Sequence, residues 1–431
     1  YATLAAQNFT TATDTYNTTV GYNSGTAVTT GLANTIIGGL AGDALTDADD
    51  NTVVGTAALS SDTLGSHTTA IGKNALYAQN FTTATDSNNT AVGYHAGIAV
   101  TTGQFNTFVG AKAGDALTDA DSNVAVGEDA LSSDTLGSMS VAIGRDALTT
   151  QNFTTATNSF NTAVGHEAGA SVTTGTVNTL IGARAGDALT TGSNNIALGG
   201  GALGADDVGS KTVSIGVDSL ASQNFATATD SHNTAVGYAA GNQVTTGLQN
   251  TFVGSLSGDA LTDADKNVAL GFAALGTDTL GSKSTAVGDN ALGSQNFTTA
   301  TDTFNTAVGF EAGSRITTGV QNTLIGGLAG DSLTTGQENV AMGYAALDSD
   351  TAGKGSIAIG VNSLGVQNFS TATYSNNVSI GHNSGASVTT GIQNVIAGAY
   401  AGDALTDADN NIAIGYVALS SDTLGSSSYR N

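Results

Sequence analysis

Short segments in which β-branched or aliphatic residues alternate with a small residue recur along the chain, and each is followed by a glycine. Thr18–Val20 precedes Gly21, and a later copy, Thr90–Val92, precedes Gly93. The residue before the glycine is aliphatic, the residue two positions earlier is usually Thr, Val or Ile, and the residue between them is mostly small. This alternation predicts a short β-strand with one buried face. We expect the aliphatic and β-branched positions to point inward, the middle position to point outward, and the glycine to turn the chain.

These anchor glycines are spaced with almost no variation. The steps are 17, 17, 17 and then 21 residues, and this quartet repeats every 72 residues. A fixed short period predicts a solenoid, in which each period adds one coil that contacts only its neighbours. We therefore expect an all-β protein, a parallel β-solenoid (β-roll) of about 24 coils, in which 17/17/17/21-residue coils form six 72-residue superrepeats. The regular period predicts one continuous domain over residues 1–431.

Polar residues mark one corner of each predicted coil. An asparagine stands four residues before most anchors, as at Asn34 and Asn51, and Ser or Thr replaces it in the fourth coil, as at Thr68. These short side chains can hydrogen bond to backbone groups at a corner. Stacked coil on coil, they are expected to form a polar ladder. The fourth coil is four residues longer and carries the segment 79–85, so its loop is expected to project from the stack.

Charge narrows the range of partners. The chain has 35 acidic and 10 basic residues, a net charge of −25, which argues against nucleic acid and anionic membranes as partners. No apolar run is long enough to insert into a membrane. Cysteine is absent, the five histidines lie in unrelated surroundings, and no nucleophile motif is present. We expect no enzymatic activity and no required cofactor.

The middle strand position is large and apolar in the second coil of every quartet. Because we expect this position to face outward, it is a candidate contact between chains, together with aromatic residues that follow the first anchor of a quartet. The alternative is that the neighbouring long loop covers both sets. The candidate interface residues are Ile36, Phe108, Leu180, Phe252, Leu324, Ile396, Tyr22, Tyr94, Tyr238 and Phe310.

Acidic pairs in the second coil are a candidate calcium site. Asp-x-Asp spacing supplies hard oxygen ligands of the kind that Ca²⁺ prefers. The candidate ligands are Asp43, Asp47, Asp49, Asp115, Asp119, Asp121, Asp259, Asp263, Asp265, Asp403, Asp407 and Asp409. Quartets three and five replace the pair with Thr-Thr-Gly, so the coil does not need the metal to fold. The alternative is a solvated acidic edge.

An N-glycosylation pattern recurs on the long loop. Asn-Phe-Thr or Asn-Phe-Ser satisfies the acceptor rule in five of the six quartets. The candidate sites are Asn8, Asn80, Asn152, Asn296 and Asn368.

Two strings carry a resemblance to a known family. The segments 161–169 and 141–148 contain a Val-Gly or Val-Ala-Ile-Gly core followed by Ala three residues later. They resemble the head repeats of YadA-like trimeric autotransporter adhesins, which also occur in tail-fibre-like and other surface proteins. The resemblance covers the whole chain and implies a left-handed parallel β-roll, extracellular or cell-surface display, and adhesion by trimers. The 17-residue coil and the 72-residue superrepeat are not part of that family's pattern.

The chain length adds an expectation about assembly. It is one residue short of six periods, and a solenoid cut in phase with its repeat could stack head to tail. We therefore expect a non-enzymatic extracellular structural protein, a subunit of a surface or matrix filament, with an adhesive role as a further hypothesis. Its partners would be other copies of itself, in a head-to-tail or lateral homo-oligomer that includes the trimer, and a surface or glycan ligand. The alternative is the receptor-binding head of a trimeric adhesin or phage tail fibre.

Overall fold

Three-residue strands build the fold. The computed structural model describes residues 2–421, and a strand precedes every anchor glycine in this range. Neighbouring strands pair in parallel and in register, so that Thr18, Thr19 and Val20 lie opposite Thr35, Ile36 and Ile37. The described residues contain no helix, and hence none that is long and apolar enough to cross a membrane. The predicted all-β parallel β-solenoid is confirmed, with 23 such strands, one in each coil.

The chain divides into two compact units. Unit 1 runs to Thr212 and includes Asn224–Asp230, whereas unit 2 contains Val213–Gln223 and continues from Ser231. The three-residue strands of unit 1 are β1 (Thr18–Val20), β2 (Thr35–Ile37), β3 (Thr52–Val54), β5 (Thr69–Ile71), β7 (Thr90–Val92), β8 (Thr107–Val109), β9 (Val124–Val126), β11 (Val141–Ile143), β13 (Thr162–Val164), β14 (Thr179–Ile181) and β15 (Ile196–Leu198). Those of unit 2 are β17 (Val213–Ile215), β19 (Thr234–Val236), β20 (Thr251–Val253), β21 (Val268–Leu270), β23 (Thr285–Val287), β25 (Thr306–Val308), β26 (Thr323–Ile325), β27 (Val340–Met342), β29 (Ile357–Ile359), β31 (Val378–Ile380), β32 (Val395–Ala397) and β33 (Ile412–Ile414).

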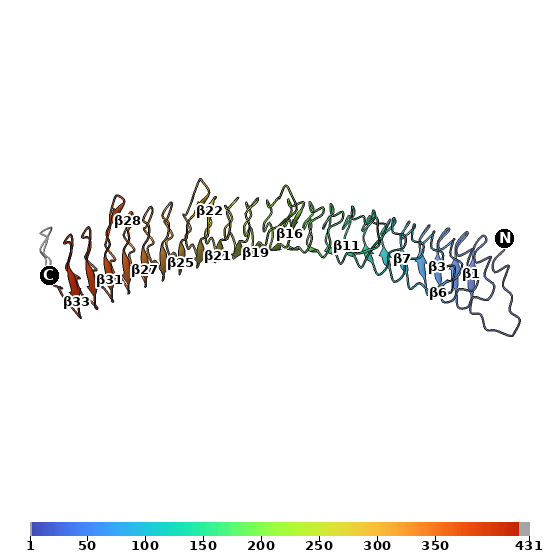
Figure 1. Ribbon diagram of the computed structural model, residues 1–431. Coiled ribbons are helices and arrows are strands. Elements are labelled where there is room, and N and C mark those ends of the chain that lie inside the picture. Colours follow the sequence, from blue (N-terminus) through green and yellow to red (C-terminus); the bar gives the residue numbers. More distant parts are fainter. Residues whose placement is uncertain (1, 422–431) are drawn as a thin grey trace. The chain divides into compact units, whose positions relative to one another are not determined.

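The longer fourth coils add short strands away from the main sheet. In Figure 1, β22 and β28 lie in loops that rise opposite β21 and β27. The two-residue strands are β4 (Gly65–Ser66), β6 (Thr85–Asp86), β10 (Gly137–Ser138), β12 (Thr157–Asn158), β16 (Gly209–Ser210), β18 (Thr229–Asp230), β22 (Gly281–Ser282), β24 (Thr301–Asp302), β28 (Gly353–Lys354) and β30 (Thr373–Tyr374). They form five separate parallel pairs, one of which joins β4 to β6. The residues 82–84 before β6 are exposed, which confirms the predicted projection of this loop.

The strands face the opposite way from the sequence prediction. The middle residues Ala91, Phe108 and Ala125 are fully buried, whereas Thr107 is half-buried and Val109 is 38% exposed. The coil is narrow, so the inward position takes a small residue unless space is made for a larger one. The prediction that the aliphatic positions point inward is therefore wrong.

Glycines make that space in the second coil of each quartet. A Cβ atom on Gly97 would lie 2.8 Å from Phe108 Cδ2, and one on Gly114 would lie 2.5 Å from Phe108 Cε1. In the third coil the sizes are reversed, because Ala125 is the middle residue and the buried Leu131 stands where Gly114 does. A large middle residue thus pairs with glycine in the second coil, whereas a small one pairs with leucine in the third.

Six of the candidate interface residues are consequently core residues. Each is 0% exposed and packs inside its own unit. The prediction that they face another chain is wrong for Ile36, Phe108, Leu180, Phe252, Leu324 and Ile396.

The predicted polar ladder is confirmed. The backbone N–H of Asn51 donates to Asn34 Oδ1 at 3.0 Å, and the Asn34 side-chain amide donates to the Ala48 carbonyl at 2.7 Å. The side chain of each such asparagine therefore hydrogen bonds to two backbone groups of the next coil. One is the N–H of the next asparagine in the ladder, and the other is the carbonyl three residues before it. The pattern is interrupted where Thr68 replaces asparagine, and Gln79 fills the gap by donating to Thr68 Oγ1 at 3.1 Å.

Gln79 also joins the third and fourth coils. Its amide donates to Asp62 Oδ2 at 2.7 Å and accepts a hydrogen bond from Asn89 at 2.9 Å. The other oxygen of Asp62 accepts from the backbone N–H groups of Gly65 and Phe81, both at 3.1 Å. This buried network explains why the third and fourth coils carry their own recurring motifs.

Candidate functional site

The strand side of each unit exposes apolar side chains to solvent. We define the strand face as the first and third residues of the three-residue strands. In unit 1 the third residues Val20, Val109 and Leu198 are 57%, 38% and 39% exposed. In unit 2 the third residues Leu270 and Ile380 are 43% and 44% exposed. The strand face therefore combines solvent-accessible Thr, Val, Ile and Leu in a regular array.

Aromatic residues widen this surface. Tyr22, Tyr94, Tyr238 and Phe310, which follow first anchors, are 54%, 48%, 58% and 55% exposed and border the strand face. At the other end of the strands, the corner residue before the asparagine position is polar or charged in most coils and apolar in a few, as at Phe105, which is 57% exposed. The sequence prediction that the four aromatic residues contact another chain stays a prediction, and their exposure is consistent with it.

The array is large for an uncovered apolar surface. The eleven strands of unit 1 are spaced about 4.8 Å apart, so their stack extends for about 48 Å. Monomeric soluble proteins rarely expose contiguous apolar patches larger than a few hundred Å². Thr methyl groups and aliphatic side chains alternate over this length without an interrupting charge, because no charged residue occupies a strand-face position. A surface of this kind is a candidate interaction site.

The aspartates of the second coil point to neighbouring coils. Asp49 Oδ1 accepts a hydrogen bond from the backbone N–H of Leu32 at 2.7 Å, and Asp43 Oδ1 accepts one from Ser60 Oγ at 2.7 Å. The hydroxyl of Thr30 donates to Asp47. The same contacts recur in later quartets, as where Leu248 N–H donates to Asp265 at 2.8 Å. The carboxylates thus link adjacent coils.

These contacts explain how quartet three dispenses with the acidic pair. In quartet three Ser193 occupies the position of Asp49, and its hydroxyl accepts from the backbone N–H of Thr176 at 3.0 Å. A hydroxyl therefore replaces the carboxylate as the acceptor between coils. The acceptor, rather than the charge, is what this position supplies.

No three of the predicted calcium ligands come together within residues 2–421. One group of potential ligands does approach within reach of a single ion in this range, namely Asp146, His166 and Glu167. Its carboxylates already have cationic partners, because Arg145 lies 2.9 Å from Asp146 and Arg184 lies 2.8 Å from Glu167. The hydrogen bond from Arg184 lowers the pKa of Glu167. Calcium binding by the second-coil aspartates stays a prediction.

Burial affects several of the carboxyl groups. Desolvation raises the pKa of Asp115 and Asp259 above the usual range of an aspartate, and the neighbouring Asp129 adds to the effect at Asp115. Burial also raises the pKa of Asp62 in the network with Gln79, although the hydrogen bonds it accepts act in the opposite direction. Asp62, Asp115 and Asp259 lie in different coils, so their carboxyl groups do not form one site.

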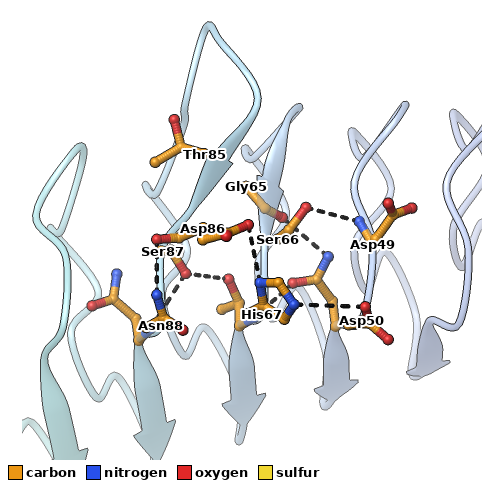
Figure 2. A network of polar contacts seen from close by, with 12 residues as sticks. Asp49, Asp50, Gly65, Ser66, His67, Thr85, Asp86, Ser87 and Asn88 are labelled. Atoms are coloured by element: carbon orange, nitrogen blue, oxygen red, sulfur yellow. Dashed lines mark hydrogen bonds and ion pairs between the residues drawn. The ribbon is translucent and has the colours of Figure 1, made fainter.

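The projecting loops carry a separate polar network. Figure 2 shows His67 between Asp50 and Asp86, with its Nδ1 3.0 Å from Asp86 and its Nε2 3.6 Å from Asp50. Beside it, Ser66 Oγ accepts from the backbone N–H of Asp49 at 2.9 Å. Lysines stand at the same position in quartets three and four, where Lys211 and Lys283 contact Asp230 and Asp302. These pairs hold the loop to the coil before it.

The predicted glycosylation sites are accessible. Asn8, Asn80, Asn152, Asn296 and Asn368 are all exposed. Asn80 Oδ1 accepts a weak hydrogen bond from Thr63 at 3.1 Å. Modification at these positions stays a prediction.

The comparisons with known proteins identify no family. No protein-family model matches the chain, and no curated protein matches it in sequence.

Proposed function

We propose that the protein is a non-enzymatic structural protein of the extracellular space that works as a side-by-side homo-oligomer. The observation that carries this proposal is the strand face, an uncharged array of exposed Thr, Val, Ile and Leu in both units. The occupant that fits it is a second copy of the same chain, because an identical array has the same spacing of about 4.8 Å between coils. Matched spacing lets aliphatic side chains of two copies interdigitate along the stack.

Net charge favours association through this face over the others. The chain carries a net charge of −25, so copies repel one another wherever their acidic loops meet. The strand face is the surface from which charged side chains are absent, and burial there removes apolar area from water. Lateral contact through the strand face is therefore favoured over contact through the acidic turns.

The resemblance to head repeats of trimeric adhesins supports three chains and display outside the cell. In this proposal the protein is the shaft or receptor-binding head of a surface fibre, and lateral association is its central feature. Head-to-tail stacking into a filament is compatible with it, since association through the strand face uses the sides of the coils.

The test uses two variants of equal charge. Val109→Lys with Val126→Lys places two ammonium groups on adjacent strands β8 and β9 of the strand face. Thr83→Lys with Thr155→Lys places the same charges on the exposed loops. We expect light scattering after gel filtration to give a multiple of 42.3 kDa for the unaltered protein and the loop variant, and the monomer mass for the strand-face variant.

The reason for the difference is desolvation, because an ammonium group buried in an apolar contact without a partner is strongly unfavourable. Far-ultraviolet circular dichroism checks that both variants keep the sheet. A monomer mass for the unaltered protein, or an unchanged oligomer in the strand-face variant, would contradict the proposal.

A further inference from the structure

A polar groove lies on the turns of unit 2. It encloses about 450 Å³ and is formed where the chain turns after β27, β29, β31 and β32. Its lining includes the carboxylates of Asp348 and Asp403 and the small residues Gly365 and Ala386. The groove lies outside the strand face, so the inference drawn from it is independent of side-by-side association.

The groove exists because two successive coils lack bulk at one position. Asp348, Gly365, Ala386 and Asp403 each stand five residues after an anchor glycine. The equivalent of Gly365 in the first quartet is Tyr77, which is 43% exposed and would fill the space. A Cβ atom on Gly365 would lie 3.5 Å from Asp348 Oδ1, which places this glycine directly beside the carboxylate.

The lining of the groove offers both hydrogen-bond donors and hydrogen-bond acceptors that have no partner within the described part of the chain. The side-chain amides of Asn362 and Asn383 make no hydrogen bond to any group in the described part of the chain. Asp403 Oδ1 is buried and has no hydrogen-bond partner among the described residues. A buried acceptor without a partner is unfavourable, so a donor supplied by a ligand would be bound there. The groove thus presents donors and acceptors side by side.

An aromatic ring completes the lining. Tyr400 is 37% exposed, and His382 packs edge-on against it with ring centroids 5.2 Å apart. This contact orients the phenol ring, and Val366, which is 45% exposed, adds an apolar surface to the lining. An oriented aromatic face suits a ligand with C–H groups on one side and hydroxyl groups around its rim.

We infer that this groove binds a short neutral saccharide. Hydroxyl groups can donate to the carboxylates of Asp348 and Asp403 and accept from the amides of Asn362 and Asn383, while a pyranose ring stacks on Tyr400. The two carboxylates and the net charge of −25 disfavour phosphate, sulfate and acidic sugars.

A single divalent cation fits this lining less well. Asp348 and Asp403 belong to coils three steps apart in the stack, which separates them by roughly 14 Å. Two carboxylates at that distance cannot share one ion, since oxygen ligands of Ca²⁺ lie about 2.4 Å from the metal.

The test combines one filling variant with a matched control. Gly365→Tyr restores the residue found at position 77 and closes the groove, and Gly365 does not have the left-handed backbone that would oppose a side chain. Ala221→Tyr makes the same change at the equivalent position two quartets earlier, outside the groove. The probes are short neutral oligosaccharides of glucose, galactose, mannose and N-acetylglucosamine, with calcium chloride alone as a separate sample. Binding of the sugars to the full chain is followed by saturation-transfer NMR, and the response to calcium by chemical-shift changes in the protein spectrum.

At least one oligosaccharide is expected to bind the unaltered protein and Ala221→Tyr but not Gly365→Tyr. Asp403→Asn and Tyr400→Ala should each weaken binding by roughly tenfold, because each removes one hydrogen-bonding or stacking partner. Binding of no oligosaccharide in the panel, or binding that survives both Gly365→Tyr and Asp403→Asn, would overturn the inference. A response of the groove residues to calcium but to no sugar would reassign the groove to a cation.

Discussion

Among single residues, the interior is set by pairs of complementary size. Phe108 occupies the space that Gly97 and Gly114 leave open, while Leu131 in the next coil occupies the space above the small Ala125. Interiors of proteins are close-packed, so a change at one member of such a pair is felt by the other. This rule accounts for the different residues of the second and third coils.

The size rule predicts a compensating pair of substitutions. Phe108→Ala leaves a cavity and should lower the free energy of unfolding by about 3–5 kcal/mol. Gly114→Leu alone should also destabilise, since its side chain would collide with Phe108. The double variant should be more stable than either single one, because it reproduces the Ala125–Leu131 arrangement of the third coil.

Thermal unfolding of the three variants, followed by circular dichroism, measures this coupling. Strictly additive losses in the double variant would show that the two positions do not share one space.

The asparagine ladder yields a second prediction among single residues. Asn106 Oδ1 accepts from the backbone N–H of Asn123 at 2.9 Å, and its amide donates to the Ala120 carbonyl at 2.8 Å. Asn106→Ala leaves both buried backbone groups without a partner and should lower the free energy of unfolding by about 2–5 kcal/mol. The exposed Asn80 serves as the control, and Asn80→Ala should change stability by about 0.5 kcal/mol or less. Chemical denaturation compares the two, and equal small effects would contradict a structural role for the ladder.

In individual coils, the orientation of the strands is what the sequence left ambiguous. A strand of three residues with alanine in the middle, such as Val124–Val126, has apolar groups on both faces. We assigned the interior to the larger side chains, but the narrow coil selects the smaller one, and a shift of one residue exchanges the two faces of a strand. The signal that would have resolved this is the exchange of Gly114 for Leu131 between coils whose middle residues are Phe108 and Ala125.

Other features of the coil were predictable because they depend on spacing alone. The anchor glycine is an example, since a Cβ atom on Gly21 would lie 2.4 Å from the carbonyl oxygen of Gly38 in the next coil. Stacked coils therefore admit no side chain at this position, and the period appears directly in the sequence. The link between Gln79 and Asp62 was not predictable, because it joins two coils whose motifs had no apparent relation.

The buried aspartates make the stability of the coil depend on pH. Desolvation raises the pKa of Asp62, Asp115, Asp187, Asp259, Asp331 and Asp348 above 3.8 in the folded protein. The folded state then binds protons more tightly than the unfolded chain, so the stability they contribute is present at low pH and is lost as pH rises through the raised pKa values. We expect the melting temperature to increase as pH falls from neutral towards 4.

General charge repulsion acts in the same direction, so the measurement needs a control. Melting curves at high salt screen the repulsion between exposed carboxylates but affect the desolvated groups less. The increase at low pH should persist in high salt. A melting temperature that falls on acidification would contradict this account of the buried carboxyl groups.

In the molecule as a whole, the strand face is the feature that connects structure to function. Each coil contributes two solvent-accessible residues from a strand such as β8, and a buried middle residue such as Phe108. The sequence predicted an interface once per quartet, whereas the structure exposes a candidate surface in every coil. The aromatic residues Tyr22 and Tyr94 belong to the border of that surface, and this part of the sequence prediction is retained in the proposal.

The central claim is that the strand face is buried between copies of the chain. Because the protein has no cysteine, one cysteine can be introduced without background. Val109→Cys places a thiol on the strand face, and Ser133→Cys places one on an exposed turn away from it. The most direct measurement is the rate at which each thiol reacts with an alkylating reagent under native conditions, together with disulfide cross-linking between chains.

We predict that the cysteine at position 109 is alkylated slowly and forms disulfides between chains, whereas the cysteine at position 133 is alkylated rapidly and does not. Equal and rapid alkylation at both positions, with no cross-linked product at position 109, would show that the strand face is open to solvent and would contradict the claim.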